Sequence, residues 1–186
     1  MRDDWPVRPA RRDEAALLPA VETASGAVFR TIPDLAWLAD GDVMPVAAHL
    51  AAIEAGTCWV VAVGDGIAGF LSARVAIEDG AGIDAGLAVL HVWEMSVTPA
   101  HQGRGMGRAL LEHAAACAEA QAMAAVTLTT FRDVAWNAPF YARAGFATLP
   151  DAALTPRLRG VLAAEAAHGL PAARRCAMRR AVAAVF

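Results

Sequence analysis

The chain has 186 residues, of which 57% are hydrophobic and 19% are charged, and its formal net charge is −3. This composition excludes a disordered chain, and the length suits a single domain with one substantial core. The hydrophobic residues are largely scattered alanines and the net charge is negative, so we expect neither a membrane nor a nucleic acid as a partner.

The first residues and the cysteines limit the cellular setting. The stretch MRDDWPVRPARRDE has charges where a secretory signal needs an apolar core, which predicts a cytoplasmic protein. Cys58, Cys117 and Cys176 are odd in number and lack CxxC spacing, so we expect neither a disulfide framework nor a metal site.

The first part of the chain reads as a short strand followed by two helices. Val7 to Ala10 predicts the strand, and Asp13 is in the place of an N-cap for a helix to about Ala24. The second helix should start near Pro45 and stop at Gly56. Between the helices we expect an irregular segment.

A β-hairpin and a further strand follow. The runs CWVVAV and IAGFLSARV are joined by GDG at residues 64–66, which is typical of two strands and a tight turn. The run LAVLHVWEMSV, Leu87 to Val97, predicts the next strand. After a group of glycines, apolar residues recur from Met106 at helical spacing, which predicts a helix that ends near Gln121.

The remaining elements complete the fold class. Val126 to Phe131 predicts a strand, Asn137 can cap a short helix that Gly145 ends, and CAMRRAV can form a last strand. This order predicts an α/β (α+β) fold, with a mixed and mostly antiparallel central sheet and helices on both faces. We expect one domain over residues 1–186, with a core of about 7–149 and a C-terminal extension, 150–186, in which no motif is evident.

The glycine-rich stretch HQGRGMGRALLEH, residues 101–113, stands where a strand gives way to a helix. At the first turn of a helix the backbone N–H groups lack partners and the helix dipole is positive, so phosphates bind there. Glycines remove the Cβ atoms that would keep a phosphate away, and two arginines lie beside this turn. The stretch therefore predicts a pyrophosphate site.

Two common phosphate-binding loops do not fit this stretch. A P-loop needs a lysine, and the chain contains none. A dinucleotide-binding fingerprint needs GxGxxG, whereas Gly103, Gly105 and Gly107 form GxGxG. A Rossmann-type oxidoreductase is therefore disfavoured.

A third design fits. Residues 102–107 read QxxGxG after the strand end EMSVTP, and residues 136–146 read WNAPFYARAGF. Together these motifs resemble the coenzyme A loop and the second landmark of the GNAT superfamily of acyltransferases. The resemblance covers roughly residues 7–146 and implies a GNAT fold, acetyl-CoA as co-substrate without a metal, and transfer of an acetyl group to an amine.

The resemblance also implies which residues hold coenzyme A. Backbone amides of the loop would bind the pyrophosphate, the strand end would offer main-chain groups to the pantetheine arm, and the second landmark would contribute an asparagine. The candidate cofactor-binding residues are Met95, Val97, Gln102, Gly103, Arg104, Gly105, Met106, Gly107, Arg108 and Asn137.

Three residues are candidates for the proton transfers. Tyr141 occupies the family's position for the acid that protonates the leaving thiolate, and a phenol with an ordinary pKa of about 10 is protonated at neutral pH. The base that takes the proton of the amine is left open between Glu94, a charged residue in an apolar run, and His91, which titrates near neutrality. Strand alternation places these two on opposite faces unless a bulge intervenes.

The acceptor amine is not specified by the sequence. A small molecule or a peptide would fit the family, and Trp37, Trp93 and the loop with Arg132 and Asp133 are candidates to line its pocket. A homodimer is common in the family. The alternative to an enzyme is a module that binds acyl-CoA as a sensor or scaffold without turnover.

Overall fold

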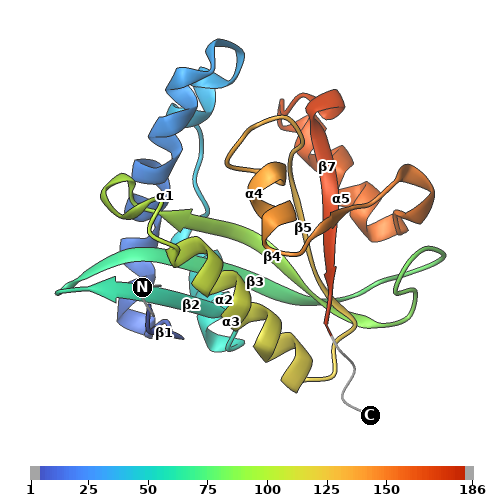
Figure 1. Cartoon of the computed structure of the whole chain (residues 1–186), viewed down its shortest axis with the longest axis horizontal. Coiled ribbons are helices and arrows are strands. Elements are labelled where there is room, and N and C mark those ends of the chain that lie inside the picture. The colour runs from blue at the N-terminus through green and yellow to red at the C-terminus, as the bar shows by residue number, and fades with distance from the viewer. Residues whose placement is uncertain (1–4, 183–186) are drawn as a thin grey trace. The chain divides into compact units, whose positions relative to one another are not determined.

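The computed structural model describes residues 5–182 and contains a seven-stranded sheet in the order β1-β2-β3-β4-β5-β7-β6 (Figure 1). β4 and β5 pair in parallel, whereas β1 with β2, β2 with β3, β5 with β7 and β6 with β7 pair antiparallel, so the predicted mixed sheet is confirmed. The strands are β1 (Val7–Pro9), β2 (Cys58–Val63), β3 (Gly66–Ile77), β4 (Ala88–Val97), β5 (Ala125–Phe131), β6 (Ala147–Thr148) and β7 (Arg175–Ala181).

In the described part of the chain, five α-helices and six 3₁₀ helices connect the strands. The α-helices are α1 (Leu18–Gly26), α2 (Val46–Glu54), α3 (Met106–Ala120), α4 (Ala138–Arg143) and α5 (Pro156–Ala167). The 3₁₀ helices are η1 (Arg12–Leu17), η2 (Ala27–Thr31), η3 (Pro33–Asp40), η4 (Pro99–His101), η5 (Asp151–Ala153) and η6 (Ala172–Arg174). Within residues 5–182, no helix combines the length and the hydropathy that a membrane crossing requires.

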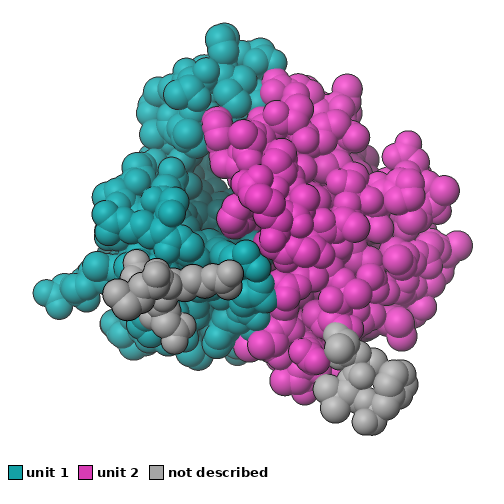
Figure 2. Space-filling model, in the orientation of Figure 1, with its two compact units in different colours: residues 1–74, 94–113 teal, residues 75–93, 114–186 magenta. Residues whose placement is uncertain are grey.

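The chain divides into two compact units, coloured separately in Figure 2. Unit 1 comprises Met1–Arg74 and Glu94–His113, and unit 2 comprises Val75–Trp93 and Ala114–Phe186.

Unit 1 contains the predicted hairpin and a compact apolar core. β2 and β3 pair from Cys58 opposite Ser72 to Val63 opposite Gly66, so the GDG turn lies where the sequence predicts it. Apolar side chains from α1, α2 and the hairpin form the core, and removing them from water stabilises this unit. The buried members are Ala10, Leu18, Val21, Ala52, Cys58, Val60 and Phe70.

The start of the first helix differs from the prediction. Asp13 does not cap a helix, because the chain forms η1 from Arg12 and becomes α-helical only at Leu18. Pro19 lies in the first turn of α1, where its missing N–H costs nothing. The segment expected to be irregular is also more ordered than predicted, because it forms the 3₁₀ helices η2 and η3.

Unit 2 holds the C-terminal extension, for which the sequence analysis found no motif. The hydroxyl of Thr155 accepts a hydrogen bond of 3.3 Å from the N–H of Leu158, and Pro156 occupies the first turn, so α5 has an ordinary helix start. Leu158 packs with Leu149, Leu154 and Ala177 in a second apolar cluster. The last predicted strand is confirmed as β7.

A buried polar network connects α5 to residues 78–79, which follow β3. Glu78 is 1% exposed and accepts hydrogen bonds from Arg157 and from the hydroxyl of Thr155. The backbone N–H of Arg157 also donates to Asp79, at 2.9 Å. The buried carboxylate of Glu78 is therefore compensated by a cation and a hydroxyl, as a buried charge requires.

Candidate active site

The glycine loop of unit 1 leaves its backbone open on the side where side chains would stand. Gly103 and Gly105 have φ angles of +74° and +88°, in the left-handed region that favours glycine. A Cβ atom added at either position would meet no atom within 4 Å. The glycines therefore keep space free at the start of α3, as a bound phosphate would need.

The first turn of α3 fixes the loop to the core of the protein. Met106 is 1% exposed and anchors the helix start. Arg108 is exposed, and its Nε lies 3.7 Å from Oε1 of Glu112, one helical turn further on. An exposed pair of this kind contributes little to stability, so Arg108 can turn toward an anion at small cost.

Two side-chain hydrogen bonds hold the loop in place. The indole N–H of Trp5 donates to the carbonyl oxygen of Arg104, at 2.7 Å. The amide of Gln102 donates to the carbonyl oxygen of Val97, at 2.9 Å. The loop is therefore tied to the strand that precedes it, and one of the carbonyl groups expected to be open at the strand end already has a partner.

The end of β4 in unit 1 carries Glu94. Its carboxylate accepts a hydrogen bond of 2.8 Å from the hydroxyl of Ser96, and both Glu94 and Met95 are partly buried. The strand lies against β3 at Gly69, where an added Cβ would come within 3.0 Å of the carbonyl oxygen of Ser96. Gly69 thus permits the close approach of the two strands.

A second carboxyl group of unit 1, Glu22 on α1, interacts with Glu94. Burial and, to a smaller extent, the charge of Glu94 raise the pKa of Glu22 to about 8, against the lowering effect of the hydrogen bond from the Met44 N–H. Sequence reasoning missed Glu22. The available signal was the same as for Glu94, because Glu22 is the only charged residue in the segment LPAVETASG.

His91 lies in the part of β4 that belongs to unit 2. It is 1% exposed, its Nδ1 is 2.9 Å from the hydroxyl of Thr127, and its ring contacts that of Trp93 edge to face. Burial lowers the pKa of His91 to about 3, and the positive charge of Arg157 contributes. His91 is therefore neutral at neutral pH and a weak proton acceptor.

The second landmark forms α4 in unit 2. Tyr141 is 8% exposed and packs edge to face against Phe140 and Phe146. Asn137 occupies the N-cap position, but its side chain makes no capping hydrogen bond there. Its Oδ1 is buried without a hydrogen-bond partner among the described residues. Such an atom is costly to leave unpaired, which is consistent with a ligand contact.

The residues expected around an acceptor are exposed or paired. Trp37 on η3 is 46% exposed and Trp93 on β4 is 45% exposed. Arg132 donates to the carbonyl oxygen of Arg175, at 2.5 Å, and Asp133 forms an ion pair with Arg174.

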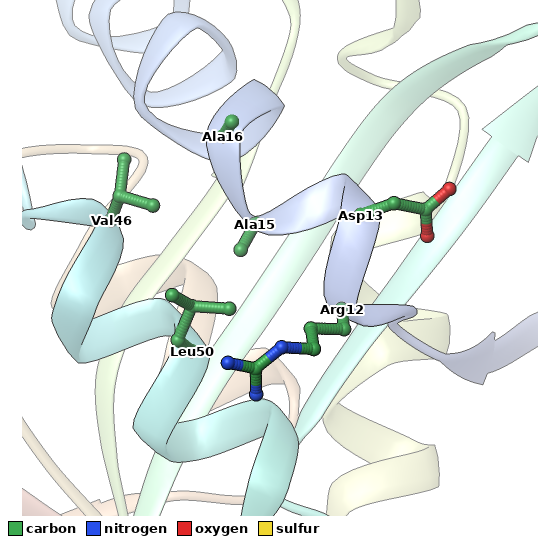
Figure 3. A pocket seen from close by; sticks show the side chains of 6 residues that line it. All are labelled: Arg12, Asp13, Ala15, Ala16, Val46 and Leu50. Atoms are coloured by element: carbon green, nitrogen blue, oxygen red, sulfur yellow. The ribbon is translucent and has the colours of Figure 1, made fainter.

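Two hollows occur elsewhere on the units. An open one of about 640 Å³ lies in unit 1 along η1 and α2, and Arg12, Val46 and Leu50 are among the residues that line it (Figure 3). Another, of about 290 Å³, lies in unit 2 and includes Arg132 and Cys176 in its wall. Neither is lined by the glycine loop, Glu94 or Tyr141, so neither is assigned to catalysis. In residues 5–182, no group of three or more His, Cys, Asp or Glu side chains could hold a metal ion.

The fold is similar to that of several solved structures. Rv2747 from Mycobacterium tuberculosis, in complex with CoA and NLQ, is 18% identical with a TM-score of 0.66, over 96% of this chain and 99% of that chain. Naa50 from Arabidopsis thaliana, in complex with the bisubstrate analogue CoA-Ac-MVNAL, is 16% identical with a TM-score of 0.60, over 94% of this chain and 95% of that chain. PaiA N-acetyltransferase from Thermoplasma acidophilum, in complex with coenzyme A, is 12% identical with a TM-score of 0.64, over 95% of this chain and 98% of that chain. At these identities the likeness is one of fold.

The sequence itself matches a family. The model of the acetyltransferase (GNAT) domain matches residues 54–148, about half of the chain, from the end of α2 to β6. The match includes the glycine loop and the helix with Tyr141, the two motifs on which the resemblance was based. The chain therefore belongs to the GNAT acetyltransferase family, whose members transfer an acetyl group from acetyl-CoA to an amine.

Proposed function

We propose that this N-acetyltransferase uses Glu94 as the general base and Tyr141 as the general acid in direct transfer of the acetyl group to an amine. The observation that carries the proposal is the placement of Glu94. It is a partly buried carboxylate on the strand that leads directly into the glycine loop, and Ser96 orients it. Acetyl-CoA supplies an activated thioester, so the chain itself has to position the amine and move two protons.

The proposed hold on coenzyme A rests on the open backbone of the loop. The N–H groups of residues 102–107 would bind the pyrophosphate, and Arg104 and Arg108 would add positive charge. Main-chain groups at Met95 and Val97 would face the pantetheine arm, and Asn137 would use its unpaired Oδ1. The vacant space at Gly103 and Gly105 supports this assignment.

His91 is a poor base in this protein. A proton acceptor with a pKa of about 3 takes a proton from an ammonium very poorly, and His91 already contacts the Thr127 hydroxyl. We therefore assign His91 to packing at the centre of β4 and the proton transfer to Glu94. Tyr141 would then protonate the departing thiolate, and the N–H near Met95 would stabilise negative charge on the carbonyl oxygen.

The acceptor is proposed to be a small-molecule or peptide amine that enters as an ammonium ion. The neighbour in complex with the bisubstrate analogue CoA-Ac-MVNAL supports a fold that accommodates a peptide acceptor. The negative net charge of the chain favours a cationic acceptor over an anionic one.

The test compares turnover with coenzyme A binding. Thiol release from acetyl-CoA is measured with a panel of amines, and CoA affinity by calorimetry, for wild type, Glu94→Gln and Tyr141→Phe. We expect turnover to fall about a hundredfold or more in Glu94→Gln and about tenfold or more in Tyr141→Phe, with CoA affinity unchanged, because only the proton transfers are lost.

The matched control is Glu54→Gln, the same substitution at a 59% exposed carboxylate of unit 1. It should leave both quantities unchanged. Full turnover in Glu94→Gln would remove Glu94 from its role. Tight CoA binding by the wild type without thiol release for any amine would favour a sensor instead of an enzyme.

A further inference from the structure

Trp5 has no part in the proposed mechanism, although it is hydrogen-bonded to the loop that is proposed to hold coenzyme A. Its indole N–H donates to the carbonyl oxygen of Arg104 at 2.7 Å, across 99 positions of the chain. Both residues belong to unit 1. Arg104 lies between Gly103 and Gly105, so the hydrogen bond reaches the middle of the open part of the loop.

The strand that follows Trp5 holds it in place. Pro6 restricts the residue before it to extended conformations, which limits the directions that Trp5 can take. β1 begins at Val7 and pairs with β2. The guanidinium of Arg8 donates to both carboxylate oxygens of the buried Glu14, at 2.6 and 2.9 Å. The indole is therefore attached to a backbone that the sheet fixes.

The hydrogen bond from Trp5 determines how one peptide group of the loop is turned. In a trans peptide the C=O and the N–H point in opposite directions. The peptide between Arg104 and Gly105 is trans and its oxygen accepts from Trp5, so the N–H of Gly105 points away from the indole. Within residues 5–182, none of the backbone hydrogen bonds found has this N–H as its donor. It is one of the amides that the proposed function assigns to the pyrophosphate.

This peptide group can rotate easily if it is not tethered. Gly105 has φ of +88° and no Cβ atom, so both signs of φ are accessible to it at little cost. An added Cβ would meet no atom within 4 Å, so the neighbouring atoms leave room for the rotation. The hydrogen bond from Gln102 to Val97 lies before Gly103 and does not involve this peptide. The bond from Trp5 is thus the contact that selects one orientation.

We infer that Trp5 is a positioning residue for the coenzyme A loop, because it holds the peptide between Arg104 and Gly105 with the Gly105 N–H directed at the pyrophosphate. The inference rests on the proposed function, since it requires the loop amides to bind the pyrophosphate. Without the hydrogen bond the peptide populates both orientations, and only one of them can donate to the ligand. The affinity for coenzyme A then falls by the fraction of loops that remain competent to bind.

The experiment measures CoA affinity by calorimetry and acetyl transfer by thiol release in wild type, Trp5→Phe and Trp5→His. Phenylalanine keeps an aromatic ring without an N–H, whereas the Nε2–H of histidine takes the place of the indole N–H on a similar five-membered ring. We expect Trp5→Phe to weaken CoA binding about threefold to tenfold, the scale of one hydrogen bond. The KM for acetyl-CoA should rise by the same factor with kcat unchanged. Trp5→His should retain more of the affinity.

The matched control is Thr31→Val. It removes a hydrogen bond of 2.8 Å from an exposed side chain of unit 1 to a backbone carbonyl oxygen, that of Val28. This variant should leave CoA affinity, KM and kcat unchanged. A purely structural role for Trp5 would lower kcat or the melting temperature and leave the CoA affinity of the folded protein as it is in the wild type.

Hydrogen exchange gives a readout that does not use activity. The indole N–H of Trp5 is identified in the proton–nitrogen NMR spectrum as the tryptophan signal that Trp5→Phe lacks. Because the coupling between ligand binding and the Trp5 hydrogen bond is mutual, coenzyme A should slow the exchange of this proton. Pantetheine, which has no pyrophosphate, should not slow it.

The outcomes distinguish the inference from the proposed function. Unchanged CoA affinity in Trp5→Phe, equal losses in Trp5→Phe and Trp5→His, or an exchange rate that does not respond to coenzyme A overturns the inference. If Gly105→Ala weakens CoA binding in that case, the proposed role of the loop stands. If Gly105→Ala binds CoA as well as the wild type, the role of the loop fails, and the role of Trp5 fails with it.

Discussion

Gly80 in unit 2 and the two loop glycines of unit 1 have the same type of backbone and opposite surroundings. Gly80 in unit 2 has φ of +64°, and an added Cβ would lie 2.8 Å from the ring of Pro156. Gly103 and Gly105 in unit 1 also have positive φ, but nothing lies within 4 Å of an added Cβ. The first is a glycine because another part of the chain occupies the space. The others keep space empty, which is typical of a site for a ligand.

The carboxyl groups of the two regions differ in the same way. Glu78, close to Gly80, is satisfied by Arg157 and the Thr155 hydroxyl. Glu22, in the unit that holds the open loop, is influenced mainly by burial and by the like charge of Glu94. A buried carboxylate with a cation and a hydroxyl as hydrogen-bond partners, such as Glu78, stabilises the fold. A buried carboxyl group without a cation, such as Glu22, can instead bind a proton.

The largest expected effect comes from breaking the satisfied network. Arg157→Ala leaves the Glu78 carboxylate, 1% exposed, without its cation. Removing one partner of a buried ion pair costs about 3 to 5 kcal/mol of unfolding free energy, which urea denaturation measures. Arg159→Ala, an exposed arginine on the same helix, is the control and should cost less than about 1 kcal/mol. Equal losses in both variants would mean that the network contributes nothing special.

The same substitution, glycine to alanine, should have different effects at Gly105 and at Gly80. Gly105→Ala should weaken coenzyme A binding by about tenfold or more, because its methyl group fills the space proposed for the pyrophosphate. Gly80→Ala should leave the CoA affinity unchanged but lower the stability more than Gly105→Ala does, since it adds a contact with Pro156 to a similar backbone strain of about 1 to 2 kcal/mol. Calorimetric titration and thermal melting measure the two effects. Unaltered CoA affinity in Gly105→Ala would contradict the proposed loop function.

The smallest effect concerns the stability of the carboxyl pair. Because the pKa of Glu22 is raised to about 8 in the folded protein, the unfolded chain loses this proton first, and stability is lost as pH rises from about 4.5 toward 8. Glu22→Gln lacks this loss, so its Tm should exceed that of the wild type at pH 8.5 and approach it at pH 5. A gain of 1 kcal/mol corresponds to about 2 to 4 °C for a chain of this length. A difference in Tm that is the same at both pH values would count against a raised pKa.

Sequence patterns predicted the elements that carry strong local signals. The hairpin at residues 58–77 has strand-forming residues around a glycine turn, and the helix from Met106 has regular apolar spacing after the loop; both are confirmed. Pro45 and Gly56 likewise bound the second helix as expected, since Val46–Glu54 is helical and Gly56 has positive φ. These signals act over a few residues, so neighbouring parts of the chain are not needed to interpret them.

The features that the sequence did not predict either lack a clear local pattern or depend on residues far away in the chain. Helix α5 went unnoticed because its alanine-rich segment lacks a clear apolar face, although Thr155 and Pro156 are an ordinary helix start. The burial of His91 depends on Thr127 and Arg157, which are distant in sequence. The influence of Glu94 on Glu22 crosses an even wider stretch of chain. The choice between two bases could not be made from local pattern, because pKa values depend on such distant neighbours.

The bond between Arg157 and Glu78 joins residues that are 79 positions apart, which matters during synthesis. A ribosome that has just added Glu78 must add 79 further residues before the guanidinium of Arg157 exists. Until then the carboxylate has to stay in water, and residues 75–93 cannot close around it. A nascent chain stalled before Arg157 should thus keep this segment accessible to proteases, and its maturation waits until Arg157 has been synthesised.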